Sequence, residues 1–396
     1  MSLNSTPRSN QLHIGLFGKR NVGKSTLVNA LTNQSISLVS DVAGTTTDPV
    51  FKSMEINGIG ACVFIDTAGF DDEGELGAKR VEQTQKALEK TDIAILVFSE
   101  KLTNEEISWS NNLLERKIPV IPVINKADLY TPNSDFIEQI TDLCKEPPII
   151  VSANSNAGID RLREEIVSKV PEDYDSISIT GSLAEENDLV MLVMPQDIQA
   201  PKGRLILPQV QTLRELLDKK CVVVSCTTDK ISDTLKCLAK PPKLIITDSQ
   251  AFKTVYEQKP PESLLTSFSV LFAQHKGDIE YFIESVKVLD NLKPDANILI
   301  AEACTHVPVT EDIGTKKIPA MLRKKYGDNL NITNVHGNDF PKDLSKYDLI
   351  IHCGACMFNR KYVLSRVHSA KNTGVPMTNY GVVIAYLSGI LNKIDY

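Results

Sequence analysis

Long apolar runs and a secretory leader are missing from this 396-residue sequence. No stretch of 18 apolar residues occurs, and the first eleven residues, MSLNSTPRSNQ, are polar throughout. A transmembrane helix and a signal peptide are therefore not expected, nor is a membrane partner. Eight cysteines are too few for a disulfide scaffold in a chain of this length. The sequence predicts a cytoplasmic protein whose thiols stay reduced or bind metal.

An excess of basic residues is also missing. The chain has 43 Lys and Arg against 50 Asp and Glu, a formal net charge of -7, and no local basic patch stands out. Such a chain has no general attraction for phosphate backbones, so nucleic acid is not expected as a main partner. With 42% apolar and 23% charged residues, the composition is that of ordinary globular domains. The length predicts two or three of them.

Apolar β-type runs alternate with helical stretches from about Leu12 to Val170, which predicts an α/β fold with a mainly parallel sheet. A polar stretch at 171–176 then suggests a linker, and the proline-containing stretch at 258–263 suggests a second boundary. Each later block also contains strand-like runs, 221–226 and 243–248 in one and 297–304 and 348–353 in the other. We therefore predict three α/β domains, at residues 1–172, 178–262 and 263–396.

The first domain carries a phosphate-binding loop. Residues 18–25 read GKRNVGKS, which matches G-x-x-x-x-G-K-[ST] after an apolar strand and before a helix. The two glycines let the backbone wrap around phosphate oxygens, and the helix N-terminus adds positive potential. Lys24 then reaches the β and γ phosphates and the Ser25 hydroxyl binds Mg2+. A chance glycine-rich turn is the alternative for this motif alone.

Three further motifs, in the order that a GTPase requires, remove that alternative. Asp66-Thr67-Ala68-Gly69 ends a strand, where the carboxylate can hold a magnesium water and the glycine amide can sense the γ phosphate. Asn125-Lys126-Ala127-Asp128 ends another, and its last carboxylate can accept two hydrogen bonds from guanine that adenine cannot donate. Ser152-Ala153-Asn154 completes the base pocket. The sequence thus predicts GTP and GDP as ligands.

These motifs resemble the branch of GTPases that contains TrmE and Era. The resemblance implies that residues 41–49, DVAGTTTDP, form switch I, with Thr46 as a second Mg2+ ligand. It also implies that Asn21 helps to hold a K+ ion beside the phosphates, in place of an arginine finger. Phe70 stands where Ras-like proteins have a glutamine that orients water, so we expect slow unaided hydrolysis.

The nucleotide site residues that follow from the motifs and the resemblance are Gly18, Asn21, Val22, Gly23, Lys24, Ser25, Thr26, Thr46, Asp66, Gly69, Asn125, Lys126, Asp128, Ser152, Ala153 and Asn154. Of these, Lys24, Asp66 and Gly69 are predicted to act in catalysis, and Ser25 and Thr46 to bind the metal.

The third block contains two clusters of soft metal ligands. One is Cys304-Thr305-His306 and the other is His352-Cys353-Gly354-Ala355-Cys356, and each follows an apolar run. If the two runs are neighbouring parallel strands, both clusters lie at one edge of a sheet, where open α/β folds build sites. Thiolates in this pattern suit either structural zinc or an iron-sulfur cluster, and spacing alone does not choose between them.

Nearly the whole chain resembles the maturation GTPases of iron-iron hydrogenase, the HydF family. The resemblance rests on DTAGFDDEGELG at 66–77, MPQDIQAPKGRLILPQVQ at 194–211 and the C-x-H and H-C-x-x-C clusters. It implies a 4Fe-4S cluster on Cys304, Cys353 and Cys356, with His306 or His352 as an exchangeable fourth ligand.

The same resemblance implies the architecture and the partners. A P-loop GTPase domain is followed by an α/β dimerisation domain, which makes a homodimer, and by a Rossmann-like α/β cluster-binding domain. As a scaffold, the protein receives a transient two-iron precursor made with two radical-SAM maturases and delivers it to apo iron-iron hydrogenase.

A second hypothesis is an RNA- or ribosome-associated GTPase of the Era and TrmE type with a structural zinc site. Its nucleotide domain would have the same motifs. The acidic net charge and the lack of a GXXG platform or of interleaved basic and aromatic residues beyond Val170 disfavour it.

Overall fold

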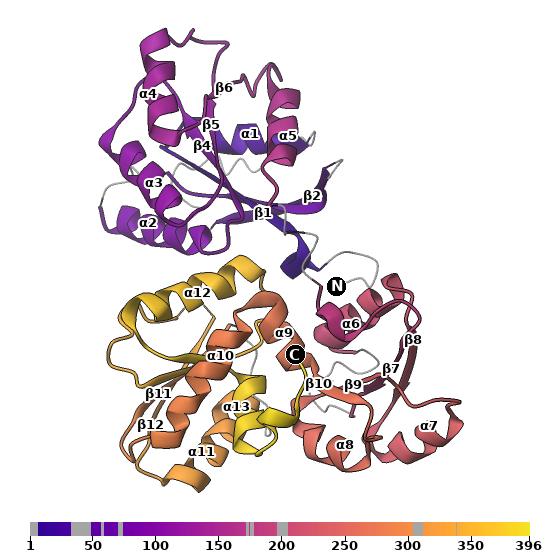
Figure 1. Ribbon diagram of the computed structural model, residues 1–396. Coiled ribbons are helices and arrows are strands. Elements are labelled where there is room, and N and C mark those ends of the chain that lie inside the picture. The colour runs from indigo at the N-terminus through magenta and orange to yellow at the C-terminus, as the bar shows by residue number, and fades with distance from the viewer. Residues whose placement is uncertain are drawn as a thin grey trace. The chain divides into compact units, whose positions relative to one another are not determined.

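The computed structural model has two compact units, Met1–Tyr174 and Asp175–Tyr396 (Figure 1). It describes the chain except residues 1–6, 33–48, 57–58, 70–73, 172–173, 175–177, 196–204, 304–311 and 338, together with the side chains of 74–80. Among the helices that it describes, none has both the length and the apolarity to cross a bilayer.

The first unit is built on a six-stranded sheet in the order β2-β3-β1-β4-β5-β6. Every neighbouring pair is parallel except β2 and β3, which form an antiparallel hairpin. The strands are β1 (Leu12–Gly18), β2 (Val50–Ile56), β3 (Gly60–Asp66), β4 (Ile93–Phe98), β5 (Val120–Ile124) and β6 (Ile149–Ile150). The central strands β1 and β4 are buried along their whole length, as expected for parallel strands covered on both faces. The helices are α1 (Lys24–Thr32), α2 (Gly74–Leu88), α3 (Asn104–Glu115), α4 (Ser134–Cys144) and α5 (Ile159–Ser168).

The second unit contains two parallel four-stranded sheets. The first has the order β10-β9-β7-β8, with β7 (Leu189–Val193), β8 (Val222–Cys226), β9 (Leu244–Thr247) and β10 (Leu264–Ser267). Its helices are α6 (Leu207–Asp218), α7 (Ile231–Cys237), α8 (Phe252–Gln258) and α9 (Phe268–Lys276). The domain boundary predicted at 262–263 thus falls before β10, which pairs with β9. The two prolines at 260–261 mark the turn into that strand, so this first sheet of the second unit extends past them.

The other sheet has the order β12-β11-β13-β14, with β11 (Asn297–Glu302), β12 (Asn331–His336), β13 (Leu349–His352) and β14 (Met377–Asn379). The helices of this part are α10 (Ile279–Val286), α11 (Ile318–Tyr326), α12 (Arg360–Thr373) and α13 (Tyr380–Leu387). A π-helical turn lies at Ile313–Lys317, and short 3-10 turns lie at Arg8–Asn10, Gly181–Leu183, Thr228–Lys230, Ser249–Ala251, Lys287–Asn291 and Leu391–Lys393.

One hydrophobic core joins the two sheets of the second unit. It includes Met191 and Ile245 from the first sheet, Ile300 and Ile351 from the second, and Val382 from α13. Helix α9 contacts α6 on one side and α12 and α13 on the other. The two sheets therefore form one compact body, with α9 between them (Figure 1).

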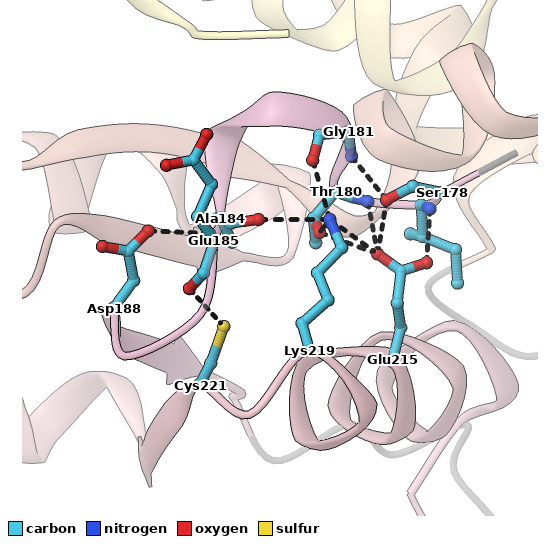
Figure 2. A network of polar contacts seen from close by, with 10 residues as sticks. Ser178, Thr180, Gly181, Ala184, Glu185, Asp188, Glu215, Lys219 and Cys221 are labelled. Atoms are coloured by element: carbon cyan, nitrogen blue, oxygen red, sulfur yellow. Dashed lines mark hydrogen bonds and ion pairs between the residues drawn. The ribbon is translucent and has the colours of Figure 1, made fainter. Parts of the chain in front are cut away.

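The chain enters this second unit through a polar network centred on Glu215 of α6 (Figure 2). The Glu215 carboxylate accepts hydrogen bonds from the Ser178 hydroxyl at 2.8 Å, from the backbone N-H of Ile179 and of Thr180, and from the Thr180 hydroxyl at 2.7 Å. Lys219, which directly follows α6, donates to the Thr180 hydroxyl and to two backbone carbonyls. The network therefore fixes residues 178–184 onto α6 just before β7.

Replacing Glu215 with Gln is expected to destabilise the second unit by about 3 kcal/mol, because a carboxylate with several donors is lost. Desolvation alone would raise the pKa of Glu215, but the hydrogen bonds outweigh it and leave the pKa below its usual 4.5. The stabilisation is therefore complete above pH 4.5 and is lost as the pH falls through the folded-state pKa. Hydrogen exchange of peptides from 178–193 in urea measures the effect.

The matched control is Glu186→Gln, because Glu186 is exposed and pairs only with the exposed Lys220 among the contacts that the structure describes. A Glu215→Gln variant as stable as this control, or a stability gap that does not narrow below pH 4.5, would contradict the assigned network.

Candidate functional site

The predicted phosphate-binding loop joins β1 to α1. Three of its residues have left-handed backbone, Gly18 at φ 154°, Asn21 at φ 61° and Gly23 at φ 91°. A Cβ on Gly23 would lie 2.4 Å from Asn125 Nδ2, so glycine is required there for space as well as for conformation. The loop turns sharply between a buried strand and a helix N-terminus, which is the geometry that presents N-H groups to phosphate.

Lys24, Ser25 and Asp66 come together at this loop. The buried Lys24 ammonium donates to the carbonyls of Gly18 at 2.8 Å and Lys19 at 2.7 Å, which holds the side chain against the loop. The exposed Ser25 hydroxyl donates to Asp66 Oδ2 at 2.6 Å. Burial raises the pKa of Asp66. The hydrogen bond from Ser25 and the charges of Lys24 and Lys52 only partly oppose this rise.

This arrangement fits Mg2+. Asp66 Oδ1 is buried and makes no hydrogen bond within the part of the chain that the structure describes. A bound cation relieves the cost of such an oxygen, and hydroxyl and carboxylate oxygens are the donors that Mg2+ prefers. Ser25 and Asp66 would thus hold the ion directly or through water.

Asn125 links the parts of the predicted base pocket. Its Nδ2 donates to the Val22 carbonyl at 2.9 Å, and its Oδ1 accepts from the Ala153 N-H at 3.1 Å. One side chain therefore ties the end of β5 to the phosphate loop and to the segment after β6. Lys126 follows with a left-handed φ of 64°, which turns the chain toward Asp128.

Asp128 is the exposed acceptor of this pocket. Its Oδ1 accepts from the Ser152 hydroxyl at 2.7 Å, and this bond is the main reason that the pKa of Asp128 lies below its ordinary value, with a smaller contribution from the Asn154 side chain. The carboxylate is therefore anionic near neutral pH and retains acceptor capacity for a ligand.

The structure thus brings together most residues of the predicted nucleotide site. Thr46, the predicted second metal ligand, lies outside the described residues, as does Phe70. Asn21 and Thr26 are exposed at the loop and at the start of α1. Binding of K+ at Asn21 stays a prediction.

The predicted arrangement of the two cysteine clusters depends on the strands that precede them. Strands β11 and β13 are parallel neighbours, with Ala301 paired to His352, so the expectation of adjacent parallel strands is confirmed. Cys304 and His306 lie just beyond β11 and outside the described residues. Among the residues that the structure describes, no group of three metal-ligating side chains occurs.

Cys353 has a sulfur atom that accepts two backbone hydrogen bonds. Its Sγ accepts a hydrogen bond from the N-H of Ala303 at 3.1 Å and from that of Ala355 at 3.4 Å. Burial raises the pKa of the Cys353 thiol, and these two bonds oppose the rise. Ala303 is the residue before Cys304, so the residue that precedes the first cluster motif donates to a sulfur of the second. Cys356 is half-buried at the end of the same loop.

His352 has a different environment. Its Nδ1 lies 2.6 Å from the Cys353 carbonyl, and its Nε2 lies 2.9 Å from Nη1 of the buried Arg366 on α12. Burial and then the Arg366 charge lower the pKa of His352 to about 3, so the ring is neutral. Because Arg366 can only donate, Nε2 accepts and Nδ1 carries the proton. Both nitrogens are engaged, which favours a supporting role over a ligand role for this histidine.

Sequence reasoning missed Arg366. Its guanidinium also donates to the Gly337 carbonyl at 2.6 Å, and its Cζ lies 4.7 Å from the centre of the Phe340 ring and 4.3 Å from that of the Tyr362 ring. No motif marks this residue, because its importance arises only when α12 packs beside β13.

Three family models match the chain. Residues 13–126 match one described as a 50S ribosome-binding GTPase, residues 179–277 match the hydrogen maturase F dimerization domain, and residues 280–394 match the hydrogen maturase F tetramerization domain. Together the three matches follow the order of the structural blocks described above.

Curated relatives match over a shorter range. GTPase Der of Wolinella succinogenes is 41% identical over 174 residues, 41% of this chain and 37% of that protein. The tRNA modification GTPase MnmE of Chromobacterium violaceum is 36% identical over 165 residues, 40% of this chain and 35% of that protein. The chain thus spans well under half the length of these relatives. Among solved structures, Aquifex aeolicus Era bound to GDP and AlF4- is 20% identical, with a TM-score of 0.37, covering 64% of this chain and 99% of that one.

Proposed function

Because this chain belongs to the hydrogen maturase F family, we propose that it is a GTP-hydrolysing scaffold that binds a 4Fe-4S cluster and carries a two-iron precursor to apo iron-iron hydrogenase. The main support for the cluster assignment is that the carboxyl ends of β11 and β13, which precede the two cysteine motifs, lie side by side. There the segment before Cys304 donates a backbone hydrogen bond to the Cys353 sulfur. Cys304, Cys353 and Cys356 would hold the cluster.

The donor set fits such a cluster. Backbone N-H bonds to a cysteine sulfur stabilise the thiolate and are among the factors that set cluster potential. Three cysteines leave one iron with a non-cysteine ligand, and that open position is the chemistry that a bound cluster would supply. His306 is the remaining histidine candidate for it, since both ring nitrogens of His352 are engaged.

The first unit supplies the nucleotide cycle. Lys24, Ser25 and Asp66 bind the phosphates and Mg2+, Asn125 and Asp128 select guanine, and a K+ ion beside Asn21 would add the charge that stabilises the transition state. Two radical-SAM maturases would supply the precursor. The free thiols of the described chain fit a reducing cytoplasm.

A homodimer would form through the first sheet of the second unit. Strand β8 is an edge strand of that sheet, and its first residue, Val222, is 57% exposed. An exposed apolar edge is a site for pairing with another chain. A second copy is the partner that the dimerization domain favours, and the tetramerization domain would then join dimers.

Anaerobic reconstitution with iron and sulfide tests the cluster assignment. We expect the wild type to bind about four irons per chain and to give the visible absorption and reduced EPR signal of a 4Fe-4S cluster. A variant with Ser at Cys304, Cys353 and Cys356 should bind none. The matched control carries Ser at Cys226 and Cys237, which lie in the first sheet and in α7, and it should assemble the cluster fully.

A colourless wild type that keeps one zinc per chain would overturn the scaffold proposal and favour a structural zinc site. A control variant that also loses its iron would show that iron loss is not specific to the three proposed ligands.

A further inference from the structure

A buried lysine donates hydrogen bonds to the loop that contains two of the proposed cluster ligands. Lys276 is the last residue of α9 and is only 1% exposed. Its ammonium donates to the carbonyls of Ala355 at 3.3 Å, Cys356 at 3.2 Å and Phe358 at 2.7 Å. All three acceptors belong to the turn that contains Cys356, so a single side chain links three carbonyl groups of that turn.

The turn itself needs such support. Ala355, between the two cysteines, has a left-handed φ of 45°, which is unfavourable for a residue with a Cβ. The turn is closed by one backbone bond, from the Phe358 N-H to the Ala355 carbonyl at 3.0 Å. Three bonds from an ammonium therefore stabilise a conformation that the local sequence does not favour by itself.

The charge of Lys276 has a consequence apart from its hydrogen bonds. A lysine side chain is rarely buried this fully, because its charge is costly to remove from water. A three-thiolate 4Fe-4S cluster is anionic and gains one further negative charge on reduction. A buried cation in contact with a ligand residue stabilises the reduced form more than the oxidised one.

The position of Lys276 in the chain adds a further point. It ends α9, which packs against α6 of the first sheet as well as against α12 and α13 beside the second. The loop that it holds follows β13 of the second sheet. The geometry of the cysteine loop is therefore anchored to a helix of the preceding dimerization domain.

We propose that Lys276 is a positioning residue for the iron-sulfur site, which fixes the Cys353–Cys356 loop through its three carbonyl contacts and raises the potential of the cluster through its buried charge. The proposal rests on the cluster assignment above.

The first test is the midpoint potential, measured by EPR while the reconstituted protein is titrated with dithionite, which gives one electron to each cluster. Lys276→Met removes the charge and the donors in a similar volume. We expect the equilibrium constant for reduction of the cluster to be about tenfold lower in this variant. For a one-electron couple this is a shift of about 59 mV to more negative potential. Lys276→Arg keeps charge and donors and should restore most of the wild-type potential.

The control is Lys371→Met, which removes a positive charge from α12 in the same part of the protein. Lys371 is 44% exposed and pairs with Asp278 at 2.6 Å, so solvent screens its charge. The midpoint potential of the cluster in the Lys371→Met variant should equal that of the wild type. Equal potentials for Lys276→Met and the wild type, or an equal shift in the Lys371→Met control, would overturn the electrostatic role.

The second test needs no cluster. In the metal-free protein, the rates of alkylation of Cys353 and Cys356 are followed by mass spectrometry. We expect Lys276→Met to raise both rates about tenfold while that of Cys237 stays unchanged, because the loop loses its support. Unchanged rates at both loop cysteines would overturn the positioning role. If the wild type assembles no cluster at all, the cluster assignment fails, and the alkylation rates still decide whether Lys276 holds the loop.

Discussion

Replacing Asp128 with Asn is expected to change the nucleotide preference from GTP to xanthosine triphosphate. Guanine presents two donors, N1-H and the exocyclic amine, to the two oxygens of Asp128, whereas an asparagine would place its own N-H2 against that amine. Xanthine has a carbonyl at this position, which accepts the asparagine donor. A site built for one hydrogen-bond pattern rejects the mismatched ligand strongly, so the affinity for GTP should fall on the order of 10^4-fold.

Isothermal titration with both nucleotides measures this change. Asp142→Asn is the control, because it alters an aspartate on α4 of the same unit away from the base pocket and should leave the affinity for GTP as it is. Should the Asp128 variant bind GTP as tightly as the wild type, the position of the base pocket assigned to Asn125, Asp128 and Ser152 is wrong.

The nucleotide site could be predicted from the sequence because its parts lie at strand ends. Each motif follows a short apolar run, and parallel strands bring their carboxyl ends to one edge of the sheet. The bond from Asn125 to the Val22 carbonyl, across 103 positions, shows how directly this rule applies. Most residues of the predicted pocket could therefore be identified from their type and from their position just after a strand.

The proposed cluster site was only partly predictable for the opposite reason. The strand rule correctly placed the ends of β11 and β13 together. The contacts around this site come from helices: Lys276 on α9 donates to the Cys356 carbonyl across 80 positions, and Arg366 on α12 donates to His352. A lone lysine or arginine in a helix has no signature, because its burial depends on how that helix packs. The same limit applies to His352, because its spacing in the sequence does not reveal the partners of its two ring nitrogens.

The boundary near residue 262 illustrates a further limit. Consecutive prolines commonly separate domains, yet here they precede a four-residue strand that completes a sheet. Strand pairing between β9 and β10 is a tertiary contact, and so short a strand gives little periodic signal.

Replacing Lys24 with Met is expected to lower the rate of GTP hydrolysis on the order of 10^3-fold and to leave the iron content and the EPR signal of the cluster unchanged. Lys24 supplies the positive charge at the β and γ phosphates, and preorganised charge of this kind dominates phosphoryl transfer. The proposed cluster ligands belong to the other compact unit, so we expect iron binding there not to require the P-loop lysine. Phosphate release and iron analysis of the same preparation measure both properties.

The Lys24→Met variant also tests whether GTP hydrolysis drives transfer of the precursor or release of the partners. If the nucleotide state controls how the scaffold releases its partners, one equivalent of Lys24→Met scaffold should still activate up to one equivalent of apo-hydrogenase, while turnover beyond the first delivery is lost. The control is Lys169→Met, since Lys169 directly follows α5 of the same unit and pairs with Glu146 at 2.6 Å; this variant should keep both hydrolysis and repeated delivery. A loss of the first delivery as well would instead mean that hydrolysis drives the transfer itself.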